Sequence, residues 1–351
     1  MKHTCLAAAL LASLPALAAC GDDGGSNGKT DAQFQAEVVN GMHDTVGAEL
    51  QKLVAAATAL QAAAPDHAWD ATTDAAAIDA MKTAWKNARI AYEHVEGATA
   101  PIFPELDVSM DERYDGFLGD LKPTGDQDLF DDQGVTGMHA IERILYAPTI
   151  RPEVTTFEAK QDGYKAAAFP ASPAEAAEFK TKLCQKLIDD AKSLHDQWQP
   201  QKIDLSLAYQ GLVGLMNEQK EKVNLAATGE EESRYANITL FDLRNNLEGT
   251  RTAYALFQAW IQSKDGGLDI DAKLETKFAA LKALYDADPG DQLPDVPADW
   301  SNDQPTTANL ATPFGMLWAT VHADVDPTAD GSVVFEMNAA ATKLGLAPFT
   351  E

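Results

Sequence analysis

The chain has 351 residues, of which 54 are acidic and 27 basic, and its formal net charge at pH 7 is −27. A protein this acidic repels the phosphate backbone of nucleic acids, so we exclude a nucleic-acid-binding function. The length allows one or two hydrophobic cores of ordinary size, and the chain therefore does not need disulfides for stability.

The N-terminus, residues 1–19, has the pattern of a secretory signal peptide. Lys2 is followed by an apolar run that is too short to span a bilayer, and small residues precede the expected cleavage site. Leu17-Ala18-Ala19-Cys20 resembles a bacterial lipobox, in which the cysteine becomes the lipid-modified first residue of the mature chain. We therefore expect Cys20 to carry a membrane anchor of the palmitate type. An ordinary secretory signal cleaved near Ala19 is the alternative.

Residues 20–30 are rich in Gly and polar residues, which is typical of a flexible tether. Because Gly21 rather than Asp follows the cysteine, the resemblance to lipoprotein sorting signals favours the periplasmic face of the outer membrane if the host is Gram-negative. Cys5 leaves with the signal and Cys20 carries lipid, so only Cys184 remains. No intramolecular disulfide is then possible, and we expect Cys184 to be a buried small hydrophobe.

The mature chain is predicted to be almost entirely helical, because apolar residues recur every three to four positions and β-branched alternation is scarce. Helices are expected at residues 31–63, 74–97, 134–146, 172–198, 204–227, 239–264, 270–287, 308–323 and 334–344. Residues 103–134 are expected to be irregular apart from a short helix near 111–118. This pattern indicates an all-α domain over 31–351, built as two four-helix-type bundles packed side by side at about 31–165 and 172–351.

The run Gly137-Met138-His139-Ala140-Ile141-Glu142 carries the clearest chemical signal. A spacing of three residues puts His139 and Glu142 on one helix face, one turn apart. An imidazole nitrogen and a carboxylate oxygen on the same face can bind one metal ion.

Acidic residues flank this run in the sequence. Glu93 and Glu96 are three residues apart upstream, Asp107 and Asp111 follow in the next loop, and residues 230–232 are three consecutive glutamates downstream. Acidic side chains on helix ends and loops, together with one histidine, are typical of a carboxylate-rich metal site.

Four segments, in order, resemble the imelysin-like family, and within it the EfeM/EfeO type. They are Ala88-Arg89-x-x-Tyr92-Glu93-x-x-Glu96, Leu106-Asp107 with Asp111-x-Arg113, Gly137-x-His139-x-x-Glu142, and Gly229-Glu230-Glu231 with Arg234-Tyr235 followed by Asp242-x-x-x-Asn246-x-Glu248-Gly249. The EfeO type carries an N-terminal cupredoxin-like domain. The segment between Cys20 and Asp31 has no room for one, so the chain is similar to the shorter EfeM type.

The resemblance implies two four-helix bundles, an extracytoplasmic location and a role in iron acquisition beside an iron permease and a haem peroxidase. The expected cargo is a divalent or ferric ion, with iron first and zinc or copper as alternatives. The residues that the resemblance implies as metal ligands are His139, Glu142, Glu96, Asp111 and Glu93. Glu231 and Asp242 are candidates for a second site or a contact between bundles. Arg113 and Arg143 are expected to orient carboxylates through forked hydrogen bonds.

Two other functions stay open from the sequence alone. The family has carried a peptidase label, but none of the seven histidines begins His-Glu-x-x-His, and a metal-dependent hydrolase would need a general base from elsewhere. A lipoprotein that recognises an acidic or sugar ligand, with a structural metal, is the second alternative. A di-iron oxidase is disfavoured because it needs a Glu-x-x-His on each of two helices.

Overall fold

The structure is a computed structural model that describes residues 28–350, and within this range it contains helices and no strands. The expectation of an all-α fold is confirmed. The expected signal peptide, Cys20 and most of the tether lie outside the described residues. Across the described residues, no helix combines the length and the apolar character needed to cross a membrane.

The first half of the chain forms α1 (Asp31–Ala63), α2 (Ala75–Glu93), α3 (Glu96–Thr99), α4 (Pro104–Asp111), α5 (Tyr114–Asp120), α6 (Gly137–Leu145), the short turn η1 (Ala147–Thr149), α7 (Pro152–Glu158), α8 (Pro173–Glu178), the π-helical turn η2 (Phe179–Leu183) and α9 (Cys184–Trp198). The second half forms α10 (Leu205–Leu225), α11 (Thr239–Gln262), α12 (Gly267–Asp286), α13 (Thr307–Leu310), α14 (Pro313–Val325) and α15 (Val333–Leu344). Residues 103–134 hold two short helices, α4 and α5, where one was expected.

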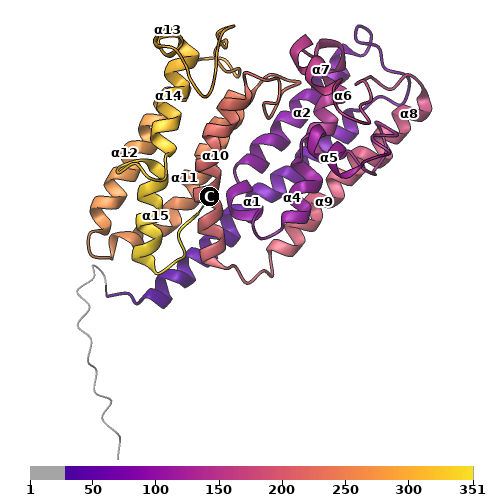
Figure 1. The fold of residues 1–351 in the computed structure, drawn as a ribbon. Coiled ribbons are helices and arrows are strands. Elements are labelled where there is room, and N and C mark those ends of the chain that lie inside the picture. The colour runs from indigo at the N-terminus through magenta and orange to yellow at the C-terminus, as the bar shows by residue number, and fades with distance from the viewer. Residues whose placement is uncertain (1–27, 351) are drawn as a thin grey trace, which may run out of the picture.

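The helices form two groups that lie side by side (Figure 1). In the first group α1, α2, α4, α6 and α9 pack together, and in the second α10, α11, α12, α14 and α15 do so. Because α9 packs on α1 rather than on the later helices, the change of group falls between Trp198 and Leu205. This change of group lies later in the chain than the boundary expected between residues 165 and 172, and the expected division into two bundles stays a prediction.

Helix α1 shows how the sequence sets an element. The Thr30 Oγ1 accepts the Gln33 N–H at 3.4 Å and the Gln33 Oε1 accepts the Thr30 N–H at 2.8 Å, which is a capping box. From there an apolar stripe including Val38, Met42 and Leu50 is buried. The stripe packs on α2 and α9, and the helix also reaches α11, so one hydrophobic cluster runs through both groups.

Two glycines allow neighbouring helices to approach each other closely. Gly137 begins α6 with φ at +82°, and a Cβ there would overlap the Met110 carbonyl at the end of α4. A Cβ on Gly211 of α10 would overlap the Gly97 carbonyl of α3. The start of α6 is thereby held against the end of α4, and α3 is held against α10. The Trp85 Nε1 also donates to the Met138 carbonyl at 3.0 Å, which fixes α6 on α2.

Among the described residues, Cys184 is a free cysteine. It lies fully buried at the start of α9. Burial raises the pKa of its thiol well above the usual value, so the side chain behaves as a neutral small hydrophobe. The expectation for this residue is confirmed.

Candidate metal site

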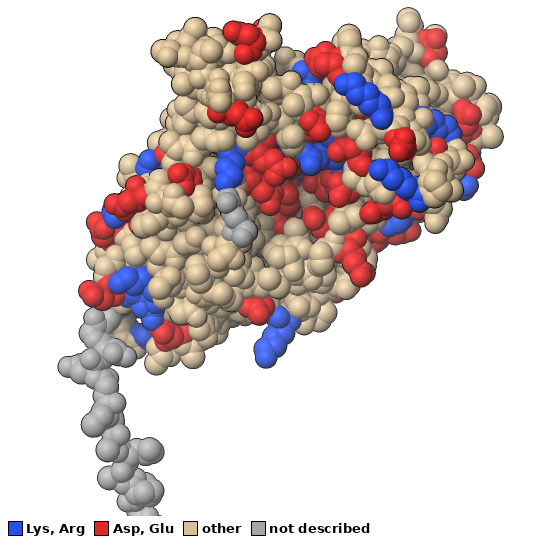
Figure 2. All heavy atoms as spheres, in the orientation of Figure 1, with Lys and Arg blue, Asp and Glu red and all other residues tan. Residues whose placement is uncertain are grey.

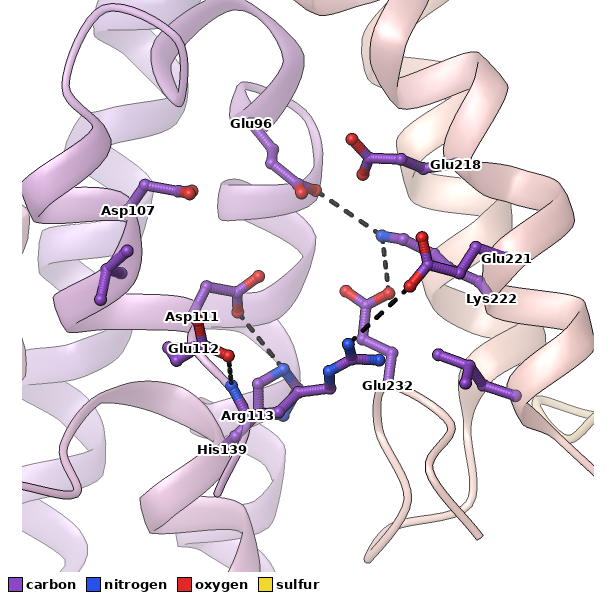
Figure 3. A pocket seen from close by; sticks show the side chains of 12 residues that line it. Glu96, Asp107, Asp111, Glu112, Arg113, His139, Glu218, Glu221, Lys222 and Glu232 are labelled. Atoms are coloured by element: carbon purple, nitrogen blue, oxygen red, sulfur yellow. Dashed lines mark hydrogen bonds and ion pairs between the residues drawn. The ribbon is translucent and has the colours of Figure 1, made fainter. Parts of the chain in front are cut away.

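A cavity of about 170 Å³ opens between the two groups of helices (Figure 3). Acidic side chains gather in this hollow on the face shown in Figure 2. The residues that line it come from α3, α4, α6, α10 and the segments next to them: Glu96, Asp107, Val108, Asp111, Glu112, Arg113, His139, Glu218, Glu221, Lys222, Leu225 and Glu232. Because carboxylates dominate the lining, the cavity favours cations over anions.

His139 projects from the first turn of α6 into the cavity and is only 1% exposed. Its Nδ1 lies 2.9 Å from the Glu142 Oε2. Its Nε2 is 3.5 Å from the Asp111 Oδ1 and has no hydrogen-bond partner. Burial, assisted by the Arg89 charge, lowers the pKa of His139 well below its usual value, so the imidazole is neutral. A neutral ring with one nitrogen held and the other unpartnered has the form of a metal ligand.

Glu142 lies behind the His139 ring rather than in the cavity. Its Oε1 accepts the Tyr235 and Ala236 N–H groups at 3.0 and 2.8 Å. Burial raises the pKa of Glu142 to about 8, although the hydrogen bond from the Ala236 N–H acts to lower this pKa. The structure therefore brings His139 and Glu142 together as expected, but it engages both Glu142 oxygens away from the other acids.

His139, Glu96, Asp111 and Glu232 line the cavity, and the fully buried Glu93 lies next to these three acids. Ligand atoms of Asp111, His139 and Glu232 lie within 4.8 Å of one another, and so do those of Glu93, Glu96, Asp111 and Glu232. Ligands around one ion stand about 2.0–2.2 Å from it, so their atoms lie within about 4.5 Å of each other. Each of the two overlapping groups is therefore close to the size of the coordination shell of one ion. We refer to these five residues as the acid–histidine group.

Glu232 was not among the residues expected from the sequence. It stands in a run of three glutamates, and no periodic pattern in that segment distinguishes the one that faces inward. Its neighbour Glu231 is buried elsewhere, where it pairs with Arg151 and accepts the Thr239 hydroxyl at 3.1 Å. Only the turn of the chain between α10 and α11 decides which of these carboxylates reaches the cavity.

A buried arginine neutralises part of the group. Arg89 on α2 is fully buried and pairs with Glu93 and Asp111, with Glu232 at 2.8 Å and with Asp242 at 3.5 Å. Asp242 is thus gathered to the same cluster through Arg89, although it does not line the cavity. The sequence signalled Arg89 only as part of a motif, because nothing in a linear pattern shows four carboxylates converging on one guanidinium.

Lys222 on α10 supplies a second buried cation. Its Nζ lies 2.6 Å from the Glu232 Oε2 and 3.9 Å from the Glu96 Oε2 (Figure 3). It also donates to the Asn246 Oδ1 at 2.8 Å. The Asn246 amide in turn donates to Glu96 at 2.9 Å and to Glu93. Lys222 was also missed from the sequence, since helix α10 reads as an ordinary amphipathic helix.

The acids do not share one electrostatic state. Burial raises the pKa of Glu93 and of Asp111 well above the usual range, although Arg89 acts to lower both. Burial would also raise the pKa of Glu232, but Lys222 and Arg89 outweigh it and hold this pKa well below its usual value. If all four acids were ionised, they would exceed the charges of Arg89 and Lys222 by two, and a bound cation would favour this ionised form.

The two arginines expected to orient carboxylates lie in different places. Arg113 lines the cavity, where its guanidinium donates to the Glu230 carbonyl at 3.3 Å and lies 3.9 Å from Glu221. The Arg143 Nε instead donates to the Glu158 Oε2 at 3.1 Å. The Arg143 guanidinium also stacks on the Tyr114 ring, and its central carbon lies 3.9 Å from the ring centroid. Arg143 ties α6 to α7, and its hydrogen-bond and ion-pair partners within the described part of the chain lie outside the acid–histidine group.

The fold and the cavity together define an all-helical protein with a buried, acidic, histidine-containing site between two bundles. The chain belongs to the imelysin family, whose sequence model matches residues 46–308. It is similar to an "Efem/EfeO family lipoprotein" of Staphylococcus haemolyticus, with 28% identity over 313 residues that cover 87% of this chain and 94% of the relative. A protein of the same description from Staphylococcus aureus strain MSSA476 is 29% identical over 205 residues, 58% of each chain.

The fold also resembles a solved structure. A crystal structure of an imelysin-like protein from Psychrobacter arcticum superposes with a TM-score of 0.59, covering 92% of this chain and 98% of that chain. The sequence identity is 13%, so this likeness concerns the fold alone.

Proposed function

We propose that this protein captures a metal ion in the cavity of the acid–histidine group and delivers it for uptake. The observation that carries the proposal is the His139 Nε2, a buried nitrogen without a partner that faces carboxylates within ligand distance of one ion. A buried polar atom of this kind costs free energy unless a ligand satisfies it. In the tautomer in which Nδ1 donates to Glu142, Nε2 keeps the lone pair that binds a metal.

The ion would be held by the His139 Nε2 with oxygens of Asp111 and Glu232, and Glu96 and Glu93 would complete or adjust the shell. Glu142 would act as a positioning residue that fixes the ring from behind. This donor set, one imidazole among carboxylates, suits iron, zinc and other divalent ions. Iron is the cargo that we propose, because the relatives are EfeM/EfeO-type proteins.

The cellular setting follows from the same resemblance. The relatives are named lipoproteins, and Leu17-Ala18-Ala19-Cys20 gives this chain the matching modification signal. We propose an extracytoplasmic protein anchored through lipid on Cys20, on the periplasmic face of the outer membrane if the host is Gram-negative. An iron permease and a haem peroxidase of one uptake system are the proposed partners.

Metal titration of the chain from Gly28 onward tests the proposal. Calorimetry with ferrous, ferric, zinc, copper and manganese ions would be run on the wild type, on His139→Ala and on His67→Ala. His67 is the matched control, because its side chain is 61% exposed and pairs with Asp74, away from the cavity. We expect binding that is lost in His139→Ala and unchanged in His67→Ala.

Three other results would contradict the carrier function. Equal binding by wild type and His139→Ala would place the metal elsewhere. Peptide hydrolysis by the wild type that disappears in His139→Ala would indicate a metal-dependent hydrolase. A collapse of thermal stability on chelation would indicate a structural metal, since its binding energy is then part of the folding energy.

A further inference from the structure

One of the basic residues that line the cavity stands where a cargo ion would compete with it. Lys222 is 7% exposed, and its Nζ lies 2.6 Å from Glu232 and 3.9 Å from Glu96. Both carboxylates belong to the acid–histidine group. Arg113, the other basic lining residue, reaches only the outer residues Glu221 and Glu230.

The ammonium and the ion would share a ligand. An ion bound at about 2.0–2.2 Å to the Glu232 Oε2, the oxygen that Lys222 contacts, would lie no more than about 5 Å from the Lys222 Nζ in its present position. Like charges at that distance repel strongly in a buried site, where solvent screens them little. The ion therefore binds against the charge of Lys222, or the ammonium must move.

The side chain has a place to move to. Glu218 and Glu221 lie on the same helix, four and one residues before Lys222, and line the cavity beside it (Figure 3). Glu218 is solvent-exposed at the mouth, and lysine has a flexible stem with a compact charge. Withdrawal toward Glu218 would free the Glu96 and Glu232 oxygens that the ammonium now occupies.

We propose that Lys222 is an affinity-determining residue: a tethered cation that occupies Glu96 and Glu232 in the metal-free protein and competes with the cargo ion. Its charge keeps the acids together before the ion arrives and weakens the bound state afterwards, so that the ion can be released to a partner. This inference rests on the proposed function, because it concerns how the same cavity holds its cargo.

A structural role for Lys222 makes the opposite prediction. If the ammonium served only to tie α10 to Asn246, at 2.8 Å, its removal would loosen the cavity and weaken metal binding. A competing cation, once removed, leaves the carboxylates free and strengthens metal binding. The sign of the change in affinity therefore separates the two roles.

The test uses Lys222→Met, which keeps the length of the side chain, Lys222→Gln, which keeps a donor for Asn246, and Lys222→Arg, which keeps the charge. Ferrous and zinc ions are the probes. Calorimetry at pH 7.5 gives the Kd, and stopped-flow transfer to a chelator gives the release rate. Lys86→Met is the control, because Lys86 pairs with Asp291 at 2.7 Å and does not line the cavity.

We expect the Kd to fall at least tenfold in Lys222→Met and Lys222→Gln, with slower release by a similar factor. Lys222→Arg and Lys86→Met should stay near the wild type. The metal-free melting temperature of the two neutral variants should fall, and the rise in melting temperature on adding metal should be larger than in the wild type, because the acids then lack a counter-charge.

Unchanged or weaker binding in whichever neutral variant folds would overturn the inference and make Lys222 a structural residue. The same holds if Lys222→Arg tightens binding as much as Lys222→Gln does, since charge would then not be the cause. A wild type that binds no ion would instead refute the proposed function, so the two failures are distinguishable.

Discussion

Glu142 illustrates how two residues of one motif take different roles. His139 points into the cavity, whereas Glu142 uses one oxygen for the ring and the other for two backbone N–H groups. Spacing in the sequence does not tell the ligand, His139, from the residue that orients it, Glu142. Both help to direct a ring nitrogen toward an ion.

We expect Glu142→Gln to weaken metal binding about tenfold to a hundredfold without abolishing it, because the amide keeps one acceptor oxygen but cannot serve both the ring and the backbone. Calorimetry beside His139→Ala measures this. Glu105→Gln, an exposed residue of α4, is the control. A loss as complete as that in His139→Ala would mean that Glu142 binds the metal directly.

At the scale of elements, the joint between α4 and α6 decides the geometry of the site. Asp111 ends α4, His139 lies in the first turn of α6, and Gly137 allows the two backbones to touch. A side chain at this glycine would have to adopt a positive φ and push the helices apart.

Gly137→Ala should lower the free energy of unfolding by about 1–3 kcal/mol and weaken metal binding, because both the backbone conformation and the close approach are lost. Thermal melts and titration check the two effects. Gly119→Ala is the matched control, since a Cβ there meets nothing within 4 Å. Equal changes in both variants would show that the joint has no special role.

The loop between α5 and α6 holds a buried acid outside the cavity, Asp126. It is 7% exposed, and its Oδ2 has no hydrogen-bond partner among the described residues. Burial raises the pKa of Asp126 to about 6, although Arg143 and Lys165 act to lower it. The folded state therefore binds this proton more tightly than the unfolded state. Its contribution to stability is present below about pH 4 and is lost as the pH rises through about 6.

Asp126→Asn, which mimics the protonated form, should stabilise the protein at pH 8 by about 1–2 kcal/mol and have little effect at pH 4. Urea unfolding at the two pH values measures the difference. A stabilisation of the same size at both would show that the charge of Asp126 is not its source.

At the scale of the whole molecule, the two groups of helices share a framework. Helix α1 packs on α2 and α9 in the first group and on α11 in the second, and the hydrophobic cluster is continuous across them. The cavity lies between the groups, so its geometry depends on their staying in register.

We expect the chain to unfold in one transition for this reason. Leu53→Ala in α1 and Phe278→Ala in α12 truncate fully buried side chains, and each should destabilise the whole protein by about 2–5 kcal/mol. Circular dichroism and tryptophan fluorescence should give coincident curves for both variants. Two separate transitions, each shifted by only one of the substitutions, would show that the groups unfold independently.

Much of the fold was predictable, because helices depend on local patterns. The apolar stripe of α1 and its cap fall within Thr30 to Ala63 as the sequence indicates, and Pro173 after Ser172 marks the start of α8. The membership of α9 in the first group was not predictable, because a helix with one apolar stripe can pack on either neighbour.

The candidate site likewise has features that local sequence predicts and features that depend on tertiary contacts. The sequence by itself determined that His139 and Glu142 share a helix face and that acids crowd the flanking segments, since both follow from spacing and composition. Only the tertiary structure decided that Glu232 rather than Glu231 faces the cavity, that Glu142 stands behind the ring, and that Lys222 enters from the other group of helices. These outcomes depend on turns and on contacts between distant parts of the chain, such as that of Glu142 with Tyr235, 93 positions away, and that of Lys222 with Glu96. Local sequence does not encode which side chains such contacts bring together.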